Sequence, residues 1–236
     1  MRDLSWLTAQ PIAHRGLHDM NKLRWENTLS AFVAAADRGY AIECDVHLSS
    51  DGIPVIFHDE PLQRLLGQEG NIWERTAAEL SACSVGGTAD CVPALETVLE
   101  RIDGRVPVII ELKGTKGRDE GLVEKVAGLL ATYPGKAAIM SFDHWLVRDF
   151  RKHAPNIPGG LTALGTSDAD IERHFSMLAH DIAFVSYHVM DLPNRFISFV
   201  RERLAMPVIT WTVRDQTAVE RTFQYADQMT FEGFEP

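Results

Sequence analysis

Three carboxylate side chains stand where short apolar runs end. Glu43 and Asp45 follow "YAI", and Glu111 follows "VPVII", with Lys113 two positions later. Side chains two positions apart on a strand share a face, so each pair is directed to one side of its strand. Three converging carboxylates would repel one another without a metal, whereas around a divalent cation they form a stable oxygen site. We therefore expect Glu43, Asp45 and Glu111 to bind a divalent cation.

Two histidines flank this acidic group. His14 ends the first apolar run, and His58 lies in "ECDVHLSSDGIPVIFHD", where two alternating runs flank Asp51 and Gly52. This dipeptide is a strong signal for a β-hairpin. With a two-residue loop at Asp51 and Gly52, the hairpin places His58 opposite Asp45. Two histidines on either side of a metal-bound group suit general acid and general base roles, and we expect both to be catalytic.

Arg15 and Lys113 add fixed positive charge to the same region. Together with three carboxylates and a divalent cation they leave a single net positive charge, which a singly charged phosphodiester would neutralise. Simpler interpretations exist for individual residues, since a histidine at a strand end often only packs and an acidic pair on a strand often faces solvent. We expect Asn27 to cap the helix that follows it and Phe142 to serve in packing.

The elements that position these residues alternate along the chain. Strand-like runs cover residues 11–14, 40–48, 106–113, 137–142, 160–164, 182–187, 207–213 and 227–231. Amphipathic stretches cover residues 28–38, 119–130, 145–152, 168–175, 194–204 and 216–225. This alternation predicts an α/β fold with a closed parallel (β/α)8 TIM barrel, whose active site lies at the C-terminal strand ends. An open doubly wound sheet is the alternative, although no glycine-rich phosphate loop follows the first strand.

The barrel is expected to form a single domain over residues 1–236, with a β-hairpin after the second strand and an insertion at about 60–104. The net charge of −10 and the absence of a basic run exclude nucleic acid as a partner. No segment reaches the roughly 18 apolar residues of a membrane span, and the N-terminal stretch lacks the pattern of a signal peptide. We therefore expect a cytoplasmic protein without a stable membrane anchor; its oligomeric state is not indicated.

The three cysteines favour reduced thiols over a disulfide framework, with a Cys83–Cys91 bridge as the alternative. Cys44 lies between Glu43 and Asp45, so strand alternation directs its thiol to the opposite face. We expect it to pack against helices and to take no part in catalysis.

Several short motifs, taken together and in order, resemble a known family. They are "HRG" at 14–16, "ENT" at 26–28, "ECDVHLSSDGIPVIFHD" at 43–59, "PALETVL" at 93–99, "ELK" at 111–113, "SF" at 141–142 and "TWTV" at 210–213. In these motifs the chain resembles the glycerophosphodiester phosphodiesterases of the phospholipase C-like phosphodiesterase superfamily. Many members end in a strand that closes with Thr-Asp-x-Pro, whereas here Phe231 and Glu232 occupy that place.

The resemblance implies hydrolysis of a glycerophosphodiester, a small-molecule substrate, to sn-glycerol 3-phosphate and an alcohol. It implies one Mg²⁺ or Ca²⁺ ion on Glu43, Asp45 and Glu111, acid–base catalysis by His14 and His58, and substrate contacts from Arg15, Lys113 and Trp211. A lysophospholipase D-like phosphodiesterase and a non-catalytic phosphodiester-binding barrel are the alternative functions. The first would favour an apolar rim or a membrane anchor, and the second should have lost a histidine or a metal carboxylate.

Overall fold

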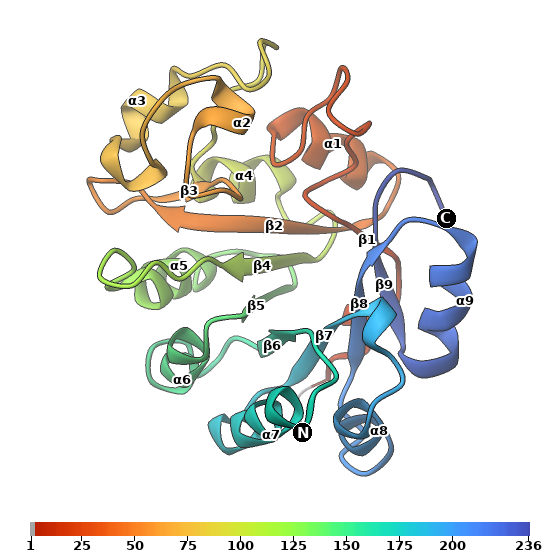
Figure 1. Cartoon of the computed structure of the whole chain (residues 1–236). Helices are drawn as coiled ribbons and strands as arrows, with labels where there is room; N and C mark the ends of the chain where they lie inside the picture. The colour runs from red at the N-terminus through yellow and green to blue at the C-terminus, as the bar shows by residue number, and fades with distance from the viewer. Residues whose placement is uncertain (1–2) are drawn as a thin grey trace.

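A computed structural model describes residues 3–236 as a closed parallel β-barrel surrounded by helices (Figure 1). The barrel strands are β1 (Ile12–Ala13), β2 (Ala41–Leu48), β4 (Val108–Leu112), β5 (Ala137–Ser141), β6 (Gly159–Ala163), β7 (Phe184–His188), β8 (Val208–Val213) and β9 (Gln228–Phe231). Each strand pairs in parallel with its neighbours, and β1 closes the ring by pairing with both β2 and β9. The expected TIM barrel is therefore confirmed, and the open sheet is excluded.

Helices follow the strands along the chain and cover the outside of the barrel (Figure 1). They are α1 (Leu29–Asp37), α4 (Leu95–Ile102), α5 (Leu122–Leu130), α6 (His144–His153), α7 (Asp168–Met177), α8 (Arg195–Glu202) and α9 (Gln216–Tyr225). Ser167, Asn194 and Asp215 cap α7, α8 and α9 by accepting backbone hydrogen bonds, as residues of these types do at helix starts. Short 3₁₀ turns lie at η1 (Ser5–Leu7), η3 (Leu178–His180) and η4 (Val189–Asp191).

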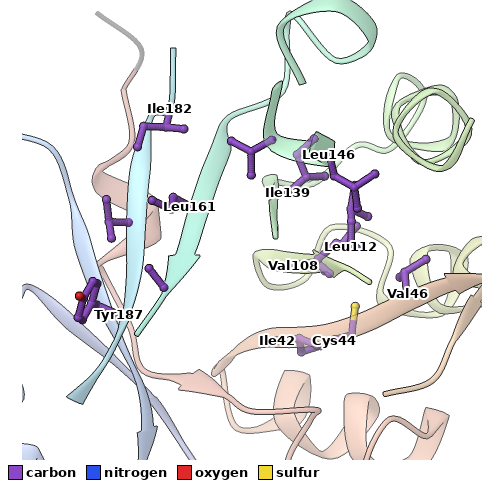
Figure 2. Packing of buried hydrophobic residues seen from close by; sticks show 14 of the residues in the cluster. Ile42, Cys44, Val46, Val108, Leu112, Ile139, Leu146, Leu161, Ile182 and Tyr187 are labelled. Carbon is purple, nitrogen blue, oxygen red and sulfur yellow. The ribbon is translucent and has the colours of Figure 1, made fainter. Parts of the chain in front are cut away.

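The main apolar core lies between the strands and the surrounding helices. Figure 2 shows Ile42, Cys44 and Val46 along β2, in the same cluster as Val108 and Leu112 of β4. Cys44 is fully buried there and its thiol is free. Because successive side chains of a strand point to opposite faces, the residues between these apolar positions face the barrel interior. Glu43 and Asp45 are therefore directed inward, away from the helices.

A second, smaller core fills the interior of the barrel. Ile12, Ile109, Met140, Phe184 and their neighbours form this cluster, which also includes Leu7 of η1. Gly160 is required beside it, because a Cβ atom at this position would lie 2.3 Å from the ring of Phe184. Apolar side chains fill this part of the barrel interior. The polar side chains lie at the other end of the barrel, at the C-terminal ends of the strands.

The β-hairpin has a different register from the expected one. Strand β3 (Pro54–Ile56) runs antiparallel to β2, with Val46 paired with Ile56 and Leu48 with Pro54. Residues 49–53 form the connection, in which Ser49 N–H donates to the carbonyl of Ile53 at 3.0 Å. The loop is therefore longer than Asp51 and Gly52 alone, and the pairing of His58 with Asp45 is wrong by one residue: Phe57 N–H donates to the Asp45 carbonyl at 3.0 Å.

After β3 the chain forms a separate small unit with α2 (Gln63–Leu66), η2 (Ile72–Glu74) and α3 (Ala77–Ser81). Figure 1 shows α2 and α3 side by side outside the ring, beyond β3. Their apolar side chains form a third cluster from Val55 to Val92, whereas those of α4 belong to the main core. Within residues 3–236, no helix is long and apolar enough to cross a membrane.

The first helix is capped by a different residue from the expected one. Thr28 is the N-cap of α1 and its side chain accepts from the Ala31 N–H, so the expectation for Asn27 is wrong. Asn27 instead has a positive φ of 56° and is buried. Asparagine tolerates this left-handed conformation better than most residues, which frees its side chain for another contact.

Candidate active site

All the expected site residues come together at the C-terminal ends of the barrel strands. A cavity of about 170 Å³ is lined by His14, Arg15, Asp45, His58, Glu111, Lys113 and Trp211, together with Phe142, His188, Thr212 and Arg214. Asp45 and Glu111 are direct partners in the β2–β4 ladder, and Glu43 lies two positions earlier on β2. Although the hairpin register differs from expectation, His58 still reaches the cavity because it lies beyond the end of β3, where the ladder no longer fixes its direction.

The three carboxylates form a compact buried cluster. Oxygen atoms of Glu43, Asp45 and Glu111 all lie within 4.8 Å of one another. Burial, together with the charges of Asp45 and Glu111, raises the pKa of Glu43 well above its usual value. Burial also raises the pKa of Glu111. Glu43 Oε1 is buried without a hydrogen-bond partner among the described residues, so this donor set fits a hard divalent cation.

Two cations surround Asp45. Lys113 Nζ lies 2.9 Å from Asp45 Oδ1 and also contacts Glu111, while Arg15 Nε lies 3.3 Å from Asp45 Oδ2. Burial acts to raise the pKa of Asp45, but the charges of Lys113 and Arg15 outweigh it and hold the pKa below its usual value. The backbone N–H of Arg15 also donates to Glu43 Oε2 at 2.9 Å. Arg15 therefore orients two of the three carboxylates.

Each histidine has a carboxylate on its Nδ1 atom. His14 Nδ1 lies 2.5 Å from Glu232 Oε2, and His58 Nδ1 lies 2.7 Å from Asp59 Oδ1. The other nitrogen of His14, Nε2, lies 4.0 Å from Glu43 Oε2. Burial lowers the pKa of both histidines below the usual value. A neutral ring can accept a proton, and a histidine that acts as the acid must carry one.

An ion-pair network supports the loop that carries Arg15. Glu26 Oε1 accepts from Arg15 Nη1 at 2.6 Å and from Arg64 Nη2 at 2.8 Å, and Arg64 Nε also donates to Asp59 Oδ2 at 2.6 Å. Burial opposes ionisation of Glu26, but hydrogen bonds from Arg64 and the charge of Arg15 lower its pKa to about 2. Arg64 belongs to α2, so the small unit after β3 is tied directly to the active-site loop.

Aromatic rings form another wall of the cavity. Trp211 makes an edge-to-face contact with Phe142 and lies beside His188, each at a centroid separation of 5.1 Å. The ladder between β8 and β9 is interrupted between Thr210 and Val213, at the level of Trp211. Such irregularities commonly re-aim a side chain next to an active site. Phe142, expected only to pack, therefore lines the cavity as well.

Sequence reasoning missed several residues that the fold brings to the site. Asp59 follows His58 directly and Glu26 belongs to the "ENT" motif, so both carried a local signal. In the sequence, Glu232 stands out only as a departure from the family pattern at the last strand. Its position 218 residues from His14 hid their contact, because the two meet only when β9 closes against β1.

Comparisons with known proteins agree with this geometry. The sequence model of the glycerophosphoryl diester phosphodiesterase family matches residues 14–234. A glycerophosphodiester phosphodiesterase of Caldanaerobacter subterraneus subsp. tengcongensis is 34% identical over 160 residues, covering 64% of this chain and 65% of that protein. One of Bacillus altitudinis is 33% identical over 187 residues, covering 75% of this chain and 73% of the relative.

The fold has the same relatives. One similar structure is that of an Oleispira antarctica phosphodiesterase in complex with the product sn-glycerol-3-phosphate. It has a TM-score of 0.79 and a sequence identity of 26%, and the match covers 95% of this chain and 92% of the other. The family match begins at His14, directly after β1, and extends beyond the last strand, so it includes every residue of the carboxylate and histidine cluster. The chain therefore belongs to the glycerophosphoryl diester phosphodiesterase family and is a phosphoric diester hydrolase of that type.

Proposed function

We propose that this enzyme hydrolyses glycerophosphodiesters to sn-glycerol 3-phosphate and an alcohol, with one divalent cation and with His14 and His58 as the acid–base pair. The observation that carries this proposal is the cluster of three buried carboxylates, two of which line one cavity together with His14 and His58. The product is the ligand of the related Oleispira antarctica phosphodiesterase, which supports the choice of substrate.

Glu43, Asp45 and Glu111 would hold the cation, Mg²⁺ or Ca²⁺. The unpartnered Glu43 Oε1 and the raised pKa values of Glu43 and Glu111 support this assignment, because a bound cation would relieve both. When bound, the ion supplies positive charge to the phosphoryl oxygens of the substrate. With the carboxylates ionised, Arg15 and Lys113 leave the site with a single net positive charge, suited to a diester with one negative charge.

The side chains supply the proton transfers. No serine or cysteine is placed beside a base in the cavity lining, so the attacking oxygen comes from water or from the substrate. The hydroxyl next to the phosphorylated carbon of glycerol is already close to phosphorus, and an intramolecular attack gains from this proximity. One histidine removes the hydroxyl proton as the new O–P bond forms, and the other gives a proton to the departing alcohol oxygen as its P–O bond breaks. Water then opens the cyclic phosphate.

Trp211, with Phe142 and His188 beside it, would line the glycerol or leaving-group side of the cavity. We place the reaction in the cytoplasm, where the three unpaired thiols of Cys44, Cys83 and Cys91 would stay reduced.

The test is a coupled assay for glycerol 3-phosphate release from glycerophosphocholine, with and without added Mg²⁺ or Ca²⁺. We expect metal-dependent turnover, and a loss of roughly 10²- to 10⁴-fold in kcat for His14→Ala and for His58→Ala. His153→Ala, on α6 outside the cavity, is the matched control. Turnover of lysophosphatidylcholine alone would favour the lysophospholipase D alternative, and binding of glycerophosphodiesters without any turnover would favour a non-catalytic barrel.

A further inference from the structure

Glu232 occupies a defined position at the closing seam of the barrel. It follows β9 directly, and its backbone N–H donates to the carbonyl of Val213 at the end of β8 at 3.0 Å. His14 N–H donates to the carbonyl of Phe231 at 3.0 Å, which fixes the end of β1 against the same turn. Backbone hydrogen bonds on both sides therefore determine where the Glu232 carboxylate and the His14 ring meet.

The Glu232 carboxylate is buried and surrounded by donors. Its Oε2 lies 2.5 Å from His14 Nδ1 and 3.6 Å from His18 Nε2, and its Oε1 accepts from Arg214 Nε at 2.6 Å. His18 Nδ1 accepts a hydrogen bond from the Met20 N–H, so His18 Nε2 carries a proton and directs it toward Glu232. Burial opposes ionisation, but these donors hold the pKa of Glu232 well below its usual value.

An ionised carboxylate can only accept hydrogen bonds, so the proton in the 2.5 Å contact belongs to His14 Nδ1. In the neutral ring, the lone pair then lies on Nε2. This is the nitrogen that faces the carboxylate cluster, 4.0 Å from Glu43 Oε2. The contact with Glu232 thus decides which ring nitrogen can exchange a proton with a substrate.

The same arrangement occurs a second time in the cavity. His58 Nδ1 contacts Asp59, and Arg64 binds that carboxylate, just as Arg214 binds Glu232. The two carboxylates reach their histidines from unrelated places in the sequence, one from the next residue and one from the far end of the chain. The two histidine–carboxylate–arginine arrangements therefore arise from unrelated parts of the sequence. Their recurrence indicates that the carboxylates serve the histidines and are not a by-product of local sequence.

We propose that Glu232 is the positioning residue for His14, holding the Nδ1–H tautomer so that Nε2 is the atom that transfers the proton. This inference rests on the proposed role of His14 in catalysis. Its structural part, the tautomer, does not depend on activity and can be measured separately.

Glu232→Gln is the sharpest variant. The amide has one oxygen and one NH₂ group, whereas His14 Nδ1–H and Arg214 both require an acceptor. We expect part of the population to shift to the Nε2–H tautomer, detected in ¹⁵N NMR spectra of histidine-labelled protein, with the His14 signals identified by their loss in His14→Gln. We also expect kcat to fall by roughly 10- to 100-fold with KM nearly unchanged, the usual scale when a hydrogen-bond partner that orients a functional histidine is lost.

Glu232→Asp keeps the ionised acceptor and is expected to retain the wild-type tautomer and to recover most of kcat. The matched control is Glu235→Gln, three residues later, where the exposed carboxylate pairs with Arg38. If Glu232→Gln does not fold, as judged by its melting temperature, the wild-type and Glu232→Asp tautomers still decide the question. A wild-type His14 with its proton on Nε2, or a folded Glu232→Gln with unchanged tautomer and kcat, would overturn the proposal. Failure of the enzyme on every glycerophosphodiester would instead count against the proposed function.

Discussion

Asn27 Nδ2 donates a hydrogen bond of 2.8 Å to Asp45 Oδ2, and Asn27 Oδ1 lies 3.3 Å from the backbone nitrogen of Asp45. Both residues are buried. Asn27 N–H also donates to the carbonyl of Arg15 at 2.9 Å, so one residue connects the loop after β1 to the carboxylate cluster. The other oxygen of Asp45 is held by Lys113. Asn27 and Lys113 together therefore fix the plane of this carboxylate.

We predict that Asn27→Gly lowers metal affinity and kcat/KM by roughly 10- to 100-fold, the usual effect of losing a partner of a metal ligand. Glycine accepts the positive φ of this position, so the change removes the side chain without straining the backbone. Calorimetric titration with Mg²⁺ or Ca²⁺ measures the affinity. Asn71→Gly, at the cap of η2 outside the cavity, is the control and should leave affinity unchanged. Unchanged affinity in Asn27→Gly would mean that Asp45 is oriented without it.

Metal binding is predicted to stabilise the fold. A ligand that binds only the native state at 100 times its Kd adds ~2.7 kcal/mol to the free energy of unfolding. We expect saturating Mg²⁺ or Ca²⁺ to raise the melting temperature of the chelated protein, and Glu43→Gln to remove most of that shift. Glu220→Gln, at an exposed site on α9, should keep it. Full activity after exhaustive chelation, with no metal detected in the sample, would remove the cation from the mechanism.

The barrel and the carboxylate cluster could be predicted from the sequence because their signals are local. Glu43 and Asp45 share a strand face by the period of two, and Asp45 pairs with Glu111 because parallel strands end at the same edge. His58 lies at the cavity, as expected, although the predicted register of the hairpin was wrong. The five-residue connection at 49–53 shifts the hairpin by one residue, and His58 reaches the site from beyond the strand.

The residues that sequence reasoning missed depend on contacts between distant parts of the chain. Asparagine is a common residue at helix N-caps, so the sequence suggests that Asn27 caps α1. Only the structure shows that Thr28 is the cap and that the Asn27 side chain contacts Asp45. Arg64 lies in the small unit after β3, and no spacing rule connects it to Glu26. Such contacts are determined by how loops pack over the barrel, for which the sequence has no periodic signal.

Cys44 is predicted to be dispensable for catalysis. Its thiol lies in the core between strands and helices, and burial raises its pKa well above the usual value, so it stays protonated. Figure 2 shows it beside Ile42 and Val46. Because side chains alternate along β2, Glu43 and Asp45 lie on the opposite face of the strand. Cys44→Ala should keep kcat and lose about 1 kcal/mol of stability, the scale for one buried heavy atom. A large fall in kcat with unchanged melting would contradict this assignment.

His174 is predicted to make the fold sensitive to acid. Burial, and then the nearby His144, lower its pKa to about 4, below the usual 6.5. Between these two values the unfolded chain binds a proton that the folded protein excludes, so this residue's contribution to stability is lost as the pH falls from 6.5 toward 4. His174→Phe should therefore show a smaller loss of unfolding free energy between pH 7 and pH 5 in urea titrations. An identical loss in both proteins would show that His174 is not the group responsible.

The route of phosphodiester cleavage can be tested with a substrate that lacks only the hydroxyl next to the phosphorylated carbon. If that hydroxyl attacks phosphorus, the deoxy analogue should turn over far more slowly than glycerophosphocholine, because water must replace a nucleophile already held in position. Phosphorus NMR of the natural reaction should show a transient five-membered cyclic phosphate. The binding constant of the analogue, measured by competition, separates weak binding from slow chemistry. If the analogue reacts at the normal rate, water attacks directly: His14 and His58 would keep their proton-transfer roles, and the cyclic route would be excluded.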